Sequence, residues 1–562
     1  MTVGGRPRRL VLVDPCLQGL GSHPYHYAAA VRAAARRAGC DVLLVTHRDF
    51  TAAPADWAVL PVCTHTAYSK YTLCGGLDRL DDRGRGPWLP AMPWAVAHAR
   101  RRRDERIAAF AQDVLPALAG LAAGDAVLVA TASELEAIGL ARALAAARPP
   151  QGVGWHVQFH FPIFRGFAAD IPRQEPRLAA ARRVLEEAAR AAAPHAITYH
   201  ATTAELAAEY ERLMPAPVGV LPYPVQVPPP ATRPTHGPLR IACLGDARPE
   251  KHSECLAEVV RQIAADPAVA GRVRFAVQTN RGYPATSRKP EHVAVTRSLT
   301  ALARAAAAGA PVELLAGPLD AAAYARELGA ADVLLLPYDQ GRYRSRCSGV
   351  VLESLAAGAV PIMTGGGWMA RQIAAAIEAH AAAVMARSRV LATRRFERPR
   401  IGRQPLTLEL AAVAPLAGGA AAVAVEVAWE GTGHVRLALP PVRVAVTGGP
   451  AGPATVLAAG AAAGVSTAIM PLTAGPGLRL EILPACGADA AAPSAITVRE
   501  LATDAPVPAS AVGLVIAAPA DAPAAIREVV RHADHYRATA AAHAATVGRT
   551  AAADEIVRRL LP

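Results

Sequence analysis

The sequence predicts an α/β protein with two doubly wound domains and an all-β domain inserted into the second of them. Short apolar runs of strand length alternate with alanine-rich helical stretches over residues 8–160. The same alternation restarts at residue 239, after a proline-rich run. From about 397 to 501 it gives way to strands with alternating polarity, separated by glycine and proline turns, which is typical of an antiparallel sandwich.

Length and composition agree with a multidomain globular protein. The 562 residues are too many for one hydrophobic core, and 52% of them are hydrophobic while 19% are charged. The formal charge of +13 favours anionic partners, although an arginine-rich, lysine-poor composition of the kind produced by a GC-rich bacterial genome accounts for much of it. No nucleic-acid-binding motif is present, so no nucleic-acid partner is expected.

The cysteines and the N-terminal segment indicate in which cellular compartment the protein is expected. Eight cysteines form neither a C-x-x-C pair nor a metal-ligand spacing, as expected of a reduced cytoplasmic protein. The basic N-terminal cluster precedes an apolar run that is too short for a signal peptide and ends at Asp14. That run is therefore predicted to be the first strand.

The first α/β domain is predicted over residues 1–225, and a proline-rich hinge over 226–238 follows it. The predicted strands of this domain lie at 8–15, 41–47, 125–131 and 152–160, and its predicted helices lie at 28–38, 107–118 and 135–147.

The second α/β domain is predicted over 239–390 and 503–545, interrupted by a β-sandwich over 391–502. Its predicted strands lie at 239–246, 273–280, 312–317, 331–338 and 359–363, with helices at 252–264, 293–308, 321–328 and 348–358. The strands predicted in the insert lie at 406–413, 421–430, 434–440, 442–447, 478–485 and 495–501. The α/β pattern resumes at 512–530, and a final helix at 551–561, in the segment 546–562, is expected to cross back to the first domain.

The most informative segment runs from Ala331 to Met363 and reads as strand, basic loop, helix start and strand. Ser348 and Gly349 open a helix whose free N–H groups point above the sheet, and Glu353 lies about one turn inside it. The loop before this helix carries three arginines, Arg342, Arg344 and Arg346. Arginines and a helix N-terminus can hold phosphate, while a carboxylate accepts hydrogen bonds from vicinal hydroxyls, so the segment suits a nucleotide that carries a ribose.

This segment resembles the donor-binding element of GT-B glycosyltransferases, in the retaining class that carries a glutamate, seven residues and a second glutamate (glycosyltransferase group 1, or family 4-like). The second glutamate falls on Glu353, followed by SLAAGAVPI, and the first falls on Ser345. The resemblance covers both α/β halves and implies a GT-B fold, with two Rossmann-like domains facing a cleft. It implies transfer of a sugar, with retention, from a nucleotide diphosphate sugar to a polysaccharide, lipid-linked or other glycan acceptor. Ser345 leaves the usual glutamate contact to the donor sugar missing.

A second segment, GDARPEKHSE, follows the strand at the start of the second domain and resembles the G-R-x-x-x-x-K-G diphosphate loop of this class. Gly245 and Lys251 match the pattern, Asp246 replaces its arginine, and His252 replaces its second glycine. Arg248 is the candidate substitute for the missing arginine. The resemblance makes Arg248 and Lys251 the groups that stabilise the charge on the leaving diphosphate. The alternative is an ordinary surface lysine at a helix start.

Further donor-binding candidates follow other strands of the second domain. Gln278 and Asn280 end the strand after the Lys251 loop, at the carboxyl edge where ligands of open α/β sheets bind. Tyr338, Tyr343 and Arg344 belong to the segment around the basic loop. A solvated loop is the alternative interpretation for this edge.

The first domain offers candidates at the ends of two strands. GLGSHPYHY follows the first strand, where the resembling enzymes have a glycine-rich loop, and makes Gly21 and His23 donor-binding candidates. Period-two alternation places His156, Gln158 and His160 on one face of a later strand. We prefer His160, at the end of that strand, as a group that positions the sugar or handles a proton. A structural histidine is the alternative.

A basic stretch from Arg100 to Arg103, near Trp88, Trp94 and His98, could contact an anionic membrane surface or a lipid-linked acceptor. A solvated basic helix face is the commoner case. No metal or other cofactor is expected, since basic side chains and a helix dipole can neutralise a diphosphate.

An alternative of another class is a catalytically inactive GT-B protein that binds a sugar or nucleotide, or acts as a scaffold. Ser345 and the inserted domain favour this alternative. The insert could bind carbohydrate, or it could be a structural or dimerising element that makes the protein a homo-oligomer. A glycan phosphorylase is disfavoured because none of the three lysines has the context of a pyridoxal lysine.

Overall fold

The computed structural model describes most of both α/β domains and the strands of the insert. The described residues are 2–3, 6–20, 23–67, 93–164, 175–214, 216–225, 233, 237–386, 388–395, 406–410, 421–430, 442–447, 454–457, 465–472, 478–484, 492–501, 507–550 and 553–561. Gly21, Trp88, the strand predicted at 434–440 and all of the hinge except residues 233 and 237–238 lie outside them.

The first domain is built on a seven-stranded sheet in which every strand pairs in parallel, in the order β5-β4-β3-β6-β7-β8-β9. Its strands are β3 Arg9–Asp14, β4 Asp41–His47, β5 Ala58–Cys63, β6 Ala126–Ala132, β7 Gly154–Phe159, β8 Ile197–Ala201 and β9 Val218–Val220. Its helices are α1 His23–Arg37, α2 Pro93–Leu118, α3 Glu134–Ala147, α4 Glu175–Ala191 and α5 Ala204–Glu211. A two-stranded ribbon, β1 Thr2–Val3 and β2 Arg6–Pro7, precedes β3.

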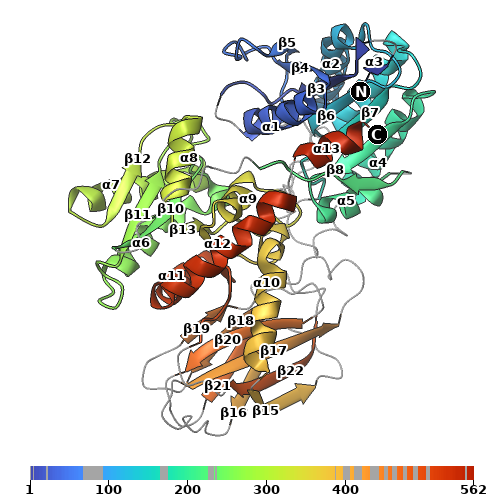
Figure 1. Ribbon diagram of the computed structural model, residues 1–562. Helices are drawn as coiled ribbons and strands as arrows, with labels where there is room; N and C mark the ends of the chain where they lie inside the picture. The colour runs from blue at the N-terminus through green and yellow to red at the C-terminus, as the bar shows by residue number, and fades with distance from the viewer. Residues whose placement is uncertain are drawn as a thin grey trace.

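The second domain has a six-stranded parallel sheet in the order β12-β11-β10-β13-β14-β23. Its strands are β10 Leu239–Cys243, β11 Val273–Gln278, β12 Val312–Leu315, β13 Val333–Leu336, β14 Val360–Thr364 and β23 Leu514–Ile516. Its helices are α6 Leu256–Ala264, α7 Pro290–Ala307, α8 Ala321–Ala330, α9 Gly349–Ala356, α10 Trp368–Met385 and α11 Ala522–Arg531. The predicted pair of parallel, Rossmann-like sheets is therefore confirmed (Figure 1).

Local differences from the predicted elements have simple causes. The helix expected from His252 begins only at α6, because two short 3-10 turns, Pro249–Lys251 and Ser253–Cys255, precede it. His252 joins these turns with a left-handed backbone, at a φ of 50°. The chain is therefore kinked directly after Lys251, and the lysine does not lie on a regular helix face.

Between β14 and β23 the chain forms two four-stranded antiparallel sheets, ordered β15-β22-β17-β20 and β16-β21-β18-β19. Their strands are β15 Ser388–Arg395, β16 Leu406–Leu410, β17 Ala421–Glu430, β18 Val442–Thr447, β19 Ala454–Leu457, β20 Val465–Leu472, β21 Leu478–Pro484 and β22 Ala492–Leu501. α10 leads into this unit (Figure 1). After it, β23 pairs with β14 in the parallel sheet.

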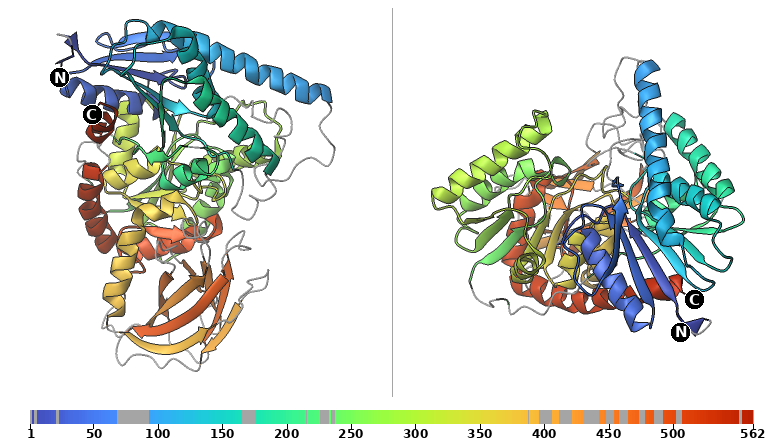
Figure 2. Two further views of the ribbon diagram at one scale, coloured as in Figure 1. Left: turned by 90° about the vertical axis from the view of Figure 1, so that its right-hand side faces the viewer. Right: turned by 90° about the horizontal axis from the view of Figure 1, so that it is seen from above.

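The last helices connect the two α/β domains. α12, Ala533–Thr550, runs along the second domain, and α13, Ala553–Leu560, lies against α1 of the first (Figure 2). Ile556 and Leu560 of α13 are buried, and Arg37 of α1 pairs with Asp554 at 2.7 Å. Arg559 also donates to the carbonyl oxygen of Val220 at 2.8 Å.

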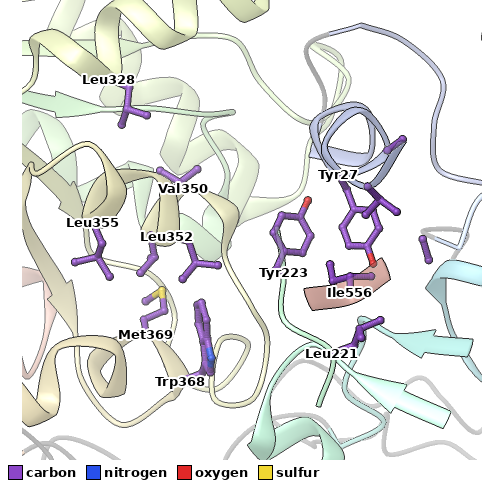
Figure 3. Packing of buried hydrophobic residues seen from close by; sticks show 14 of the residues in the cluster. Tyr27, Leu221, Tyr223, Leu328, Val350, Leu352, Leu355, Trp368, Met369 and Ile556 are labelled. Atoms are coloured by element: carbon purple, nitrogen blue, oxygen red, sulfur yellow. The ribbon is translucent and has the colours of Figure 1, made fainter. Parts of the chain in front are cut away.

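One apolar cluster continues from the first domain into the second. Tyr27 and Leu221 belong to its first-domain side, and Val350 and Leu355 to its second-domain side (Figure 3). Tyr223 connects the two sides, because its ring lies 5.3 Å from that of Tyr27, and a Cβ atom added to Gly349 would lie 3.6 Å from the Tyr223 ring. The domains therefore meet through packed side chains at the carboxyl ends of their strands.

Arg233, in the connection between the domains, is tied to the second domain. Its guanidinium donates to the carbonyl oxygens of Gly329, Ala357 and Gly358, at distances of 2.6 to 3.1 Å. These carbonyls lie at the C-terminal ends of α8 and α9, where helical carbonyls lack partners within the helix. One arginine thus satisfies two helix ends and anchors the connection.

Candidate nucleotide-binding site

Lys251 lies at the centre of the candidate site, directly above the end of β10. Gly245 follows β10 with a φ of 85°, in the left-handed region, and a Cβ atom there would collide with the Lys251 ammonium. The ammonium lies 5.3 Å from the centre of the Tyr338 ring. Burial, followed by the charge of Arg248, lowers the Lys251 pKa to about 8. Among the described residues the ammonium has no carboxylate partner.

A chain of polar contacts fixes the loop around this lysine. The Gly245 amide donates to Gln278 Oε1 at 2.6 Å, and Gln278 Nε2 donates to Asn280 Oδ1 at 2.6 Å. Asn280 Nδ2 and Arg248 Nη2 both donate to the carboxylate of Asp246. Burial alone would raise the Asp246 pKa, but the hydrogen bond and charge of Arg248 lower it overall. Arg248 is therefore partly neutralised, and Gln278 and Asn280 support the loop.

The N-terminus of α9 faces the same region. Ser348 is its N-cap residue and makes no side-chain capping bond, which leaves the first amides of the helix open to another acceptor. Glu353, one turn further, is 7% exposed and accepts a 2.5 Å hydrogen bond from the Tyr324 hydroxyl on α8. Glu353 is therefore already oriented by one hydroxyl donor.

His23, the first residue of α1, brings the first domain to this site. A Cβ atom on Gly349 would lie 2.9 Å from His23 Nδ1, so the glycine permits the close approach. The Tyr223 hydroxyl donates to the His23 carbonyl at 3.1 Å. Although solvent reaches the His23 side chain, burial among atoms of both domains lowers its pKa, and Lys251 lowers it further while Glu353 opposes the shift. Groups of both domains thus form one site.

The loop after β13 carries a second cation. Tyr338 and Tyr343 are buried, and their ring centres lie 4.8 Å apart. The guanidinium of Arg346 lies 5.5 Å from the Tyr343 ring and 5.7 Å from the ring of Phe161, in the first domain. Within the described part of the chain, Arg346 makes no ion pair or side-chain hydrogen bond. Arg346 and Lys251 are therefore two cations without anionic partners at the same domain boundary.

Arg344, in contrast, points to the first domain. Its guanidinium donates to Glu209 Oε1 of α5 at 2.6 Å, and both side chains are buried, with 12% and 5% exposure. The Thr203 hydroxyl donates to the Ser345 carbonyl at 2.6 Å. Burial raises the Glu209 pKa, and the charge of Arg344 opposes this rise. Arg344 therefore joins the domains, and its role as a donor-binding residue stays a prediction.

His160 follows β7 and faces the domain boundary. Burial and the charge of Arg346 lower its pKa to about 3, against a hydrogen bond with the backbone of Ala130 that raises it. The imidazole is therefore neutral at physiological pH. Its Nε2 atom is buried and has no hydrogen-bond partner among the described residues. The ring packs near Tyr27 and Tyr223, at 6.2 and 5.9 Å between ring centres.

The other two residues of the same strand face have hydrogen-bond partners within the protein. His156 Nδ1 lies 3.1 Å from His200 Nε2, and the His156 ring bonds to the backbone of Leu560 in α13. Gln158 accepts from the Tyr27 hydroxyl and donates to the Leu221 carbonyl, both at 2.7 Å. His156 therefore lies under α13, and the role of His160 stays a prediction.

The basic stretch on α2 is partly neutralised. Arg101 and Arg102 lie 3.8 and 3.5 Å from Glu105, and Arg103 lies 2.7 Å from Asp104. The structure does not describe the side chains of Trp94, His98 and Arg100. Across the described ranges, no helix has the length and apolar character to span a bilayer. The described side chains also contain no group of three or more His, Cys, Asp or Glu that could hold a metal ion.

The structure thus gathers most of the predicted residues at one domain boundary. His23, Gly245, Arg248, Lys251, Gln278, Asn280, Tyr338, Tyr343, Ser348, Gly349 and Glu353 lie around the ends of β10, β11 and β13 and the start of α9. Sequence reasoning missed Tyr324 and Glu209, and did not separate Arg346 from its neighbouring arginines. No sequence signal distinguishes Arg342, Arg344 and Arg346, because the carboxylate partners of the first two come from distant parts of the chain.

The comparisons with known proteins found structures of low similarity. No protein-family model and no curated protein matches the chain. Among solved structures, an E. coli trehalose-6-phosphate protein bound with UDP-2-fluoro glucose matches at 11% identity and a TM-score of 0.44, over 65% of this chain and 86% of its own. The N-terminal domain of Candida albicans trehalose-6-phosphate phosphatase matches at 13% identity and a TM-score of 0.47, over 67% of this chain and 86% of its own. The catalytic domain of Arabidopsis thaliana starch synthase IV, bound to ADP and acarbose, matches at 11% identity and a TM-score of 0.40, over 64% of this chain and 83% of its own.

Proposed function

We propose that this protein is a glycosyltransferase that moves a sugar from a nucleotide diphosphate sugar to a glycan acceptor. The observation that carries the proposal is the position of Lys251 beside Gly245, opposite His23 of the other domain. An ammonium without a carboxylate partner, next to a helix start and between two domains, suits a diphosphate that is enclosed when both substrates are bound.

Each group has a role that its surroundings support. Lys251 and Arg248 stabilise the negative charge that grows on the diphosphate as the glycosidic bond to it breaks. The open amides at the start of α9 assist them. Glu353, with one oxygen bound by Tyr324, accepts hydrogen bonds from ribose hydroxyls through its carboxylate.

The first domain contributes to the sugar side. His23 Nδ1 lies against the start of α9, where it can donate to the diphosphate or to the sugar. His160 is neutral and keeps a buried Nε2 atom, so it positions a hydroxyl and does not act as a charged acid. No side chain is assigned as a nucleophile, because the acceptor hydroxyl can attack on the face that the diphosphate leaves. Retention at the anomeric carbon rests on the sequence resemblance alone.

The test has two stages. A thermal-shift screen of common nucleotide sugars identifies the base, and hydrolysis or transfer of the bound donor is then followed over time. We expect slow turnover that Lys251→Ala abolishes, while the exposed Glu258→Gln variant keeps it. Nucleotide binding without turnover on any acceptor would instead support the inactive binding or scaffold protein, which Ser345 favours. Binding of no nucleotide at all would contradict both.

A further inference from the structure

The loop that carries Arg346 holds a cation that the diphosphate site does not account for. Its guanidinium is half-buried between the rings of Phe161 and Tyr343, from the two domains. Contacts to ring faces orient a guanidinium but leave the N–H donors at its edge unused. Among the described residues no carboxylate or carbonyl accepts from these donors.

The neighbouring arginines differ from Arg346 in this respect. Arg344 is paired with Glu209, and Arg342 lies 3.4 Å from Glu250. The carboxylates at this boundary therefore pair with the two flanking arginines, and Arg346 has no ion-pair partner among the described residues.

Arg346 lies over different rings from the diphosphate cation. Lys251 lies over Tyr338, whereas Arg346 lies over Tyr343 and over Phe161 of the first domain. The charge of Arg346 acts on both Lys251 and His160. Lys251, Arg248 and the open amides at the α9 start already supply the groups that one diphosphate needs, so Arg346 is a further cation toward the first domain.

An unpartnered polar atom lies near the same place. His160 Nε2 is buried without a hydrogen-bond partner in the described structure, and the charge of Arg346 acts on its ring. Buried polar atoms are normally paired, so this atom, together with a guanidinium that has no anionic partner, indicates a polar ligand.

We infer that Arg346 binds a second anionic group of the substrates, distinct from the diphosphate. The inference rests on the proposed function and adds a substrate class to it: one of the two sugars that the enzyme joins carries a carboxylate or a phosphate. The group sits on the donor sugar, as in a nucleotide-activated uronic acid, or on the acceptor. A guanidinium pairs with either anion through two parallel N–H bonds.

The donor arm compares pairs of nucleotide sugars by calorimetry. UDP-glucose and UDP-glucuronate, or GDP-mannose and GDP-mannuronate, differ only by the carboxylate at C6. If the donor carries the anion, the acidic member of the pair with the preferred base binds about ten- to a hundredfold more tightly. Arg346→Gln removes this difference, and Arg346→Lys, which keeps the charge, retains part of it.

The acceptor arm titrates glucuronate and glucose 6-phosphate into protein saturated with the preferred nucleoside diphosphate. If the acceptor carries the anion, the two donors of a pair bind equally, and Arg346→Gln weakens binding of the acidic acceptor. The control is Arg304→Gln, which removes the same charge from an exposed position in the last turn of α7, at the opposite edge of the sheet. Thermal unfolding verifies that each variant is folded.

The outcomes are distinguishable. Nucleotide binding with no dependence on Arg346 in either arm would overturn this inference and leave the proposed function standing. Failure to bind any nucleotide would overturn both.

Discussion

At the scale of single residues, Lys251 has a strongly lowered pKa. The ammonium therefore loses its proton as the pH rises through about 8, well before an ordinary lysine does. A diphosphate binds the protonated form. Affinity for the nucleoside diphosphate should therefore be full below about pH 7 and fall as the pH rises through about 8. Calorimetric titrations across this range measure the effect.

Arg at position 251 keeps its charge throughout that range, so the Lys251→Arg variant is the control. It should bind with an affinity that changes little between pH 7 and pH 9. A wild-type affinity that is also constant over this range would show that Lys251 does not contact the diphosphate.

Glu353 leads to a second prediction at this scale. Glu353→Gln keeps the size of the side chain but removes the charge that ribose hydroxyls and Tyr324 bond to. We expect nucleotide affinity to fall about ten- to a hundredfold, the range for a lost charged hydrogen bond. Glu258→Gln, which removes a carboxylate from the exposed face of α6, should leave the dissociation constant as it is. Equal calorimetric affinity of wild type and Glu353→Gln would rule out the ribose contact.

At the scale of elements, α5 of the first domain holds the loop that precedes α9. Glu209 pairs with Arg344, Thr203 bonds to the Ser345 carbonyl, and Glu205 lies 3.1 Å from Arg371 of α10. These contacts come from two turns of a single short helix. The position of the Arg346 loop therefore depends on α5, although α5 belongs to the other domain.

The Glu209–Arg344 pair is predicted to be worth much more than a surface pair. Glu209→Gln leaves Arg344 buried without its carboxylate, and removing one partner of a buried pair costs about 3 to 5 kcal/mol of folding stability. Urea unfolding measures this loss. Glu187→Gln, which breaks the half-exposed pair with Arg142, should cost less than about 1 kcal/mol.

A double variant tests whether the lost stability comes from the unpaired buried charge of Arg344. Adding Arg344→Met to Glu209→Gln removes the unpaired charge and should restore part of the lost stability. A double variant as unstable as the sum of the two single changes would show that the side chains act independently.

The sequence predicted the parallel strands well, because buried strands appear as uninterrupted apolar runs such as Val333–Leu336. It also placed Lys251 and Glu353 at strand or helix ends, where local motifs are visible. It did not predict which arginine of the loop is free. Arg344 finds its partner 135 residues earlier in the chain, and the Arg342 partner is 92 residues away, so only the fold decides the pairing.

At the scale of the whole molecule, the insert is predicted to be separable from nucleotide binding. α10 contacts it through a small apolar cluster that includes Ala381, Ile469 and Leu501, while the site lies at the other domain boundary. Replacing 388–506 by a short flexible linker should leave a folded protein. Its nucleotide dissociation constant should stay within about threefold of the full chain, less than 1 kcal/mol.

Calorimetry and circular dichroism on the deletion variant measure both properties. The same deletion combined with Lys251→Ala is the negative control and should bind no nucleotide. Global unfolding on deletion would show that the insert is part of the core of the second domain.

The path of the chain also constrains how this protein is assembled during synthesis. Arg37 and Asp554, which pair where α13 meets α1, are 517 residues apart in sequence. β14 must likewise wait for the whole insert to leave the ribosome before β23 can pair with it. Contacts of such long sequence separation form slowly. A nascent chain therefore exposes the boundary surface of its first domain, and an unpaired edge of its second sheet, until nearly all of the sequence has been translated.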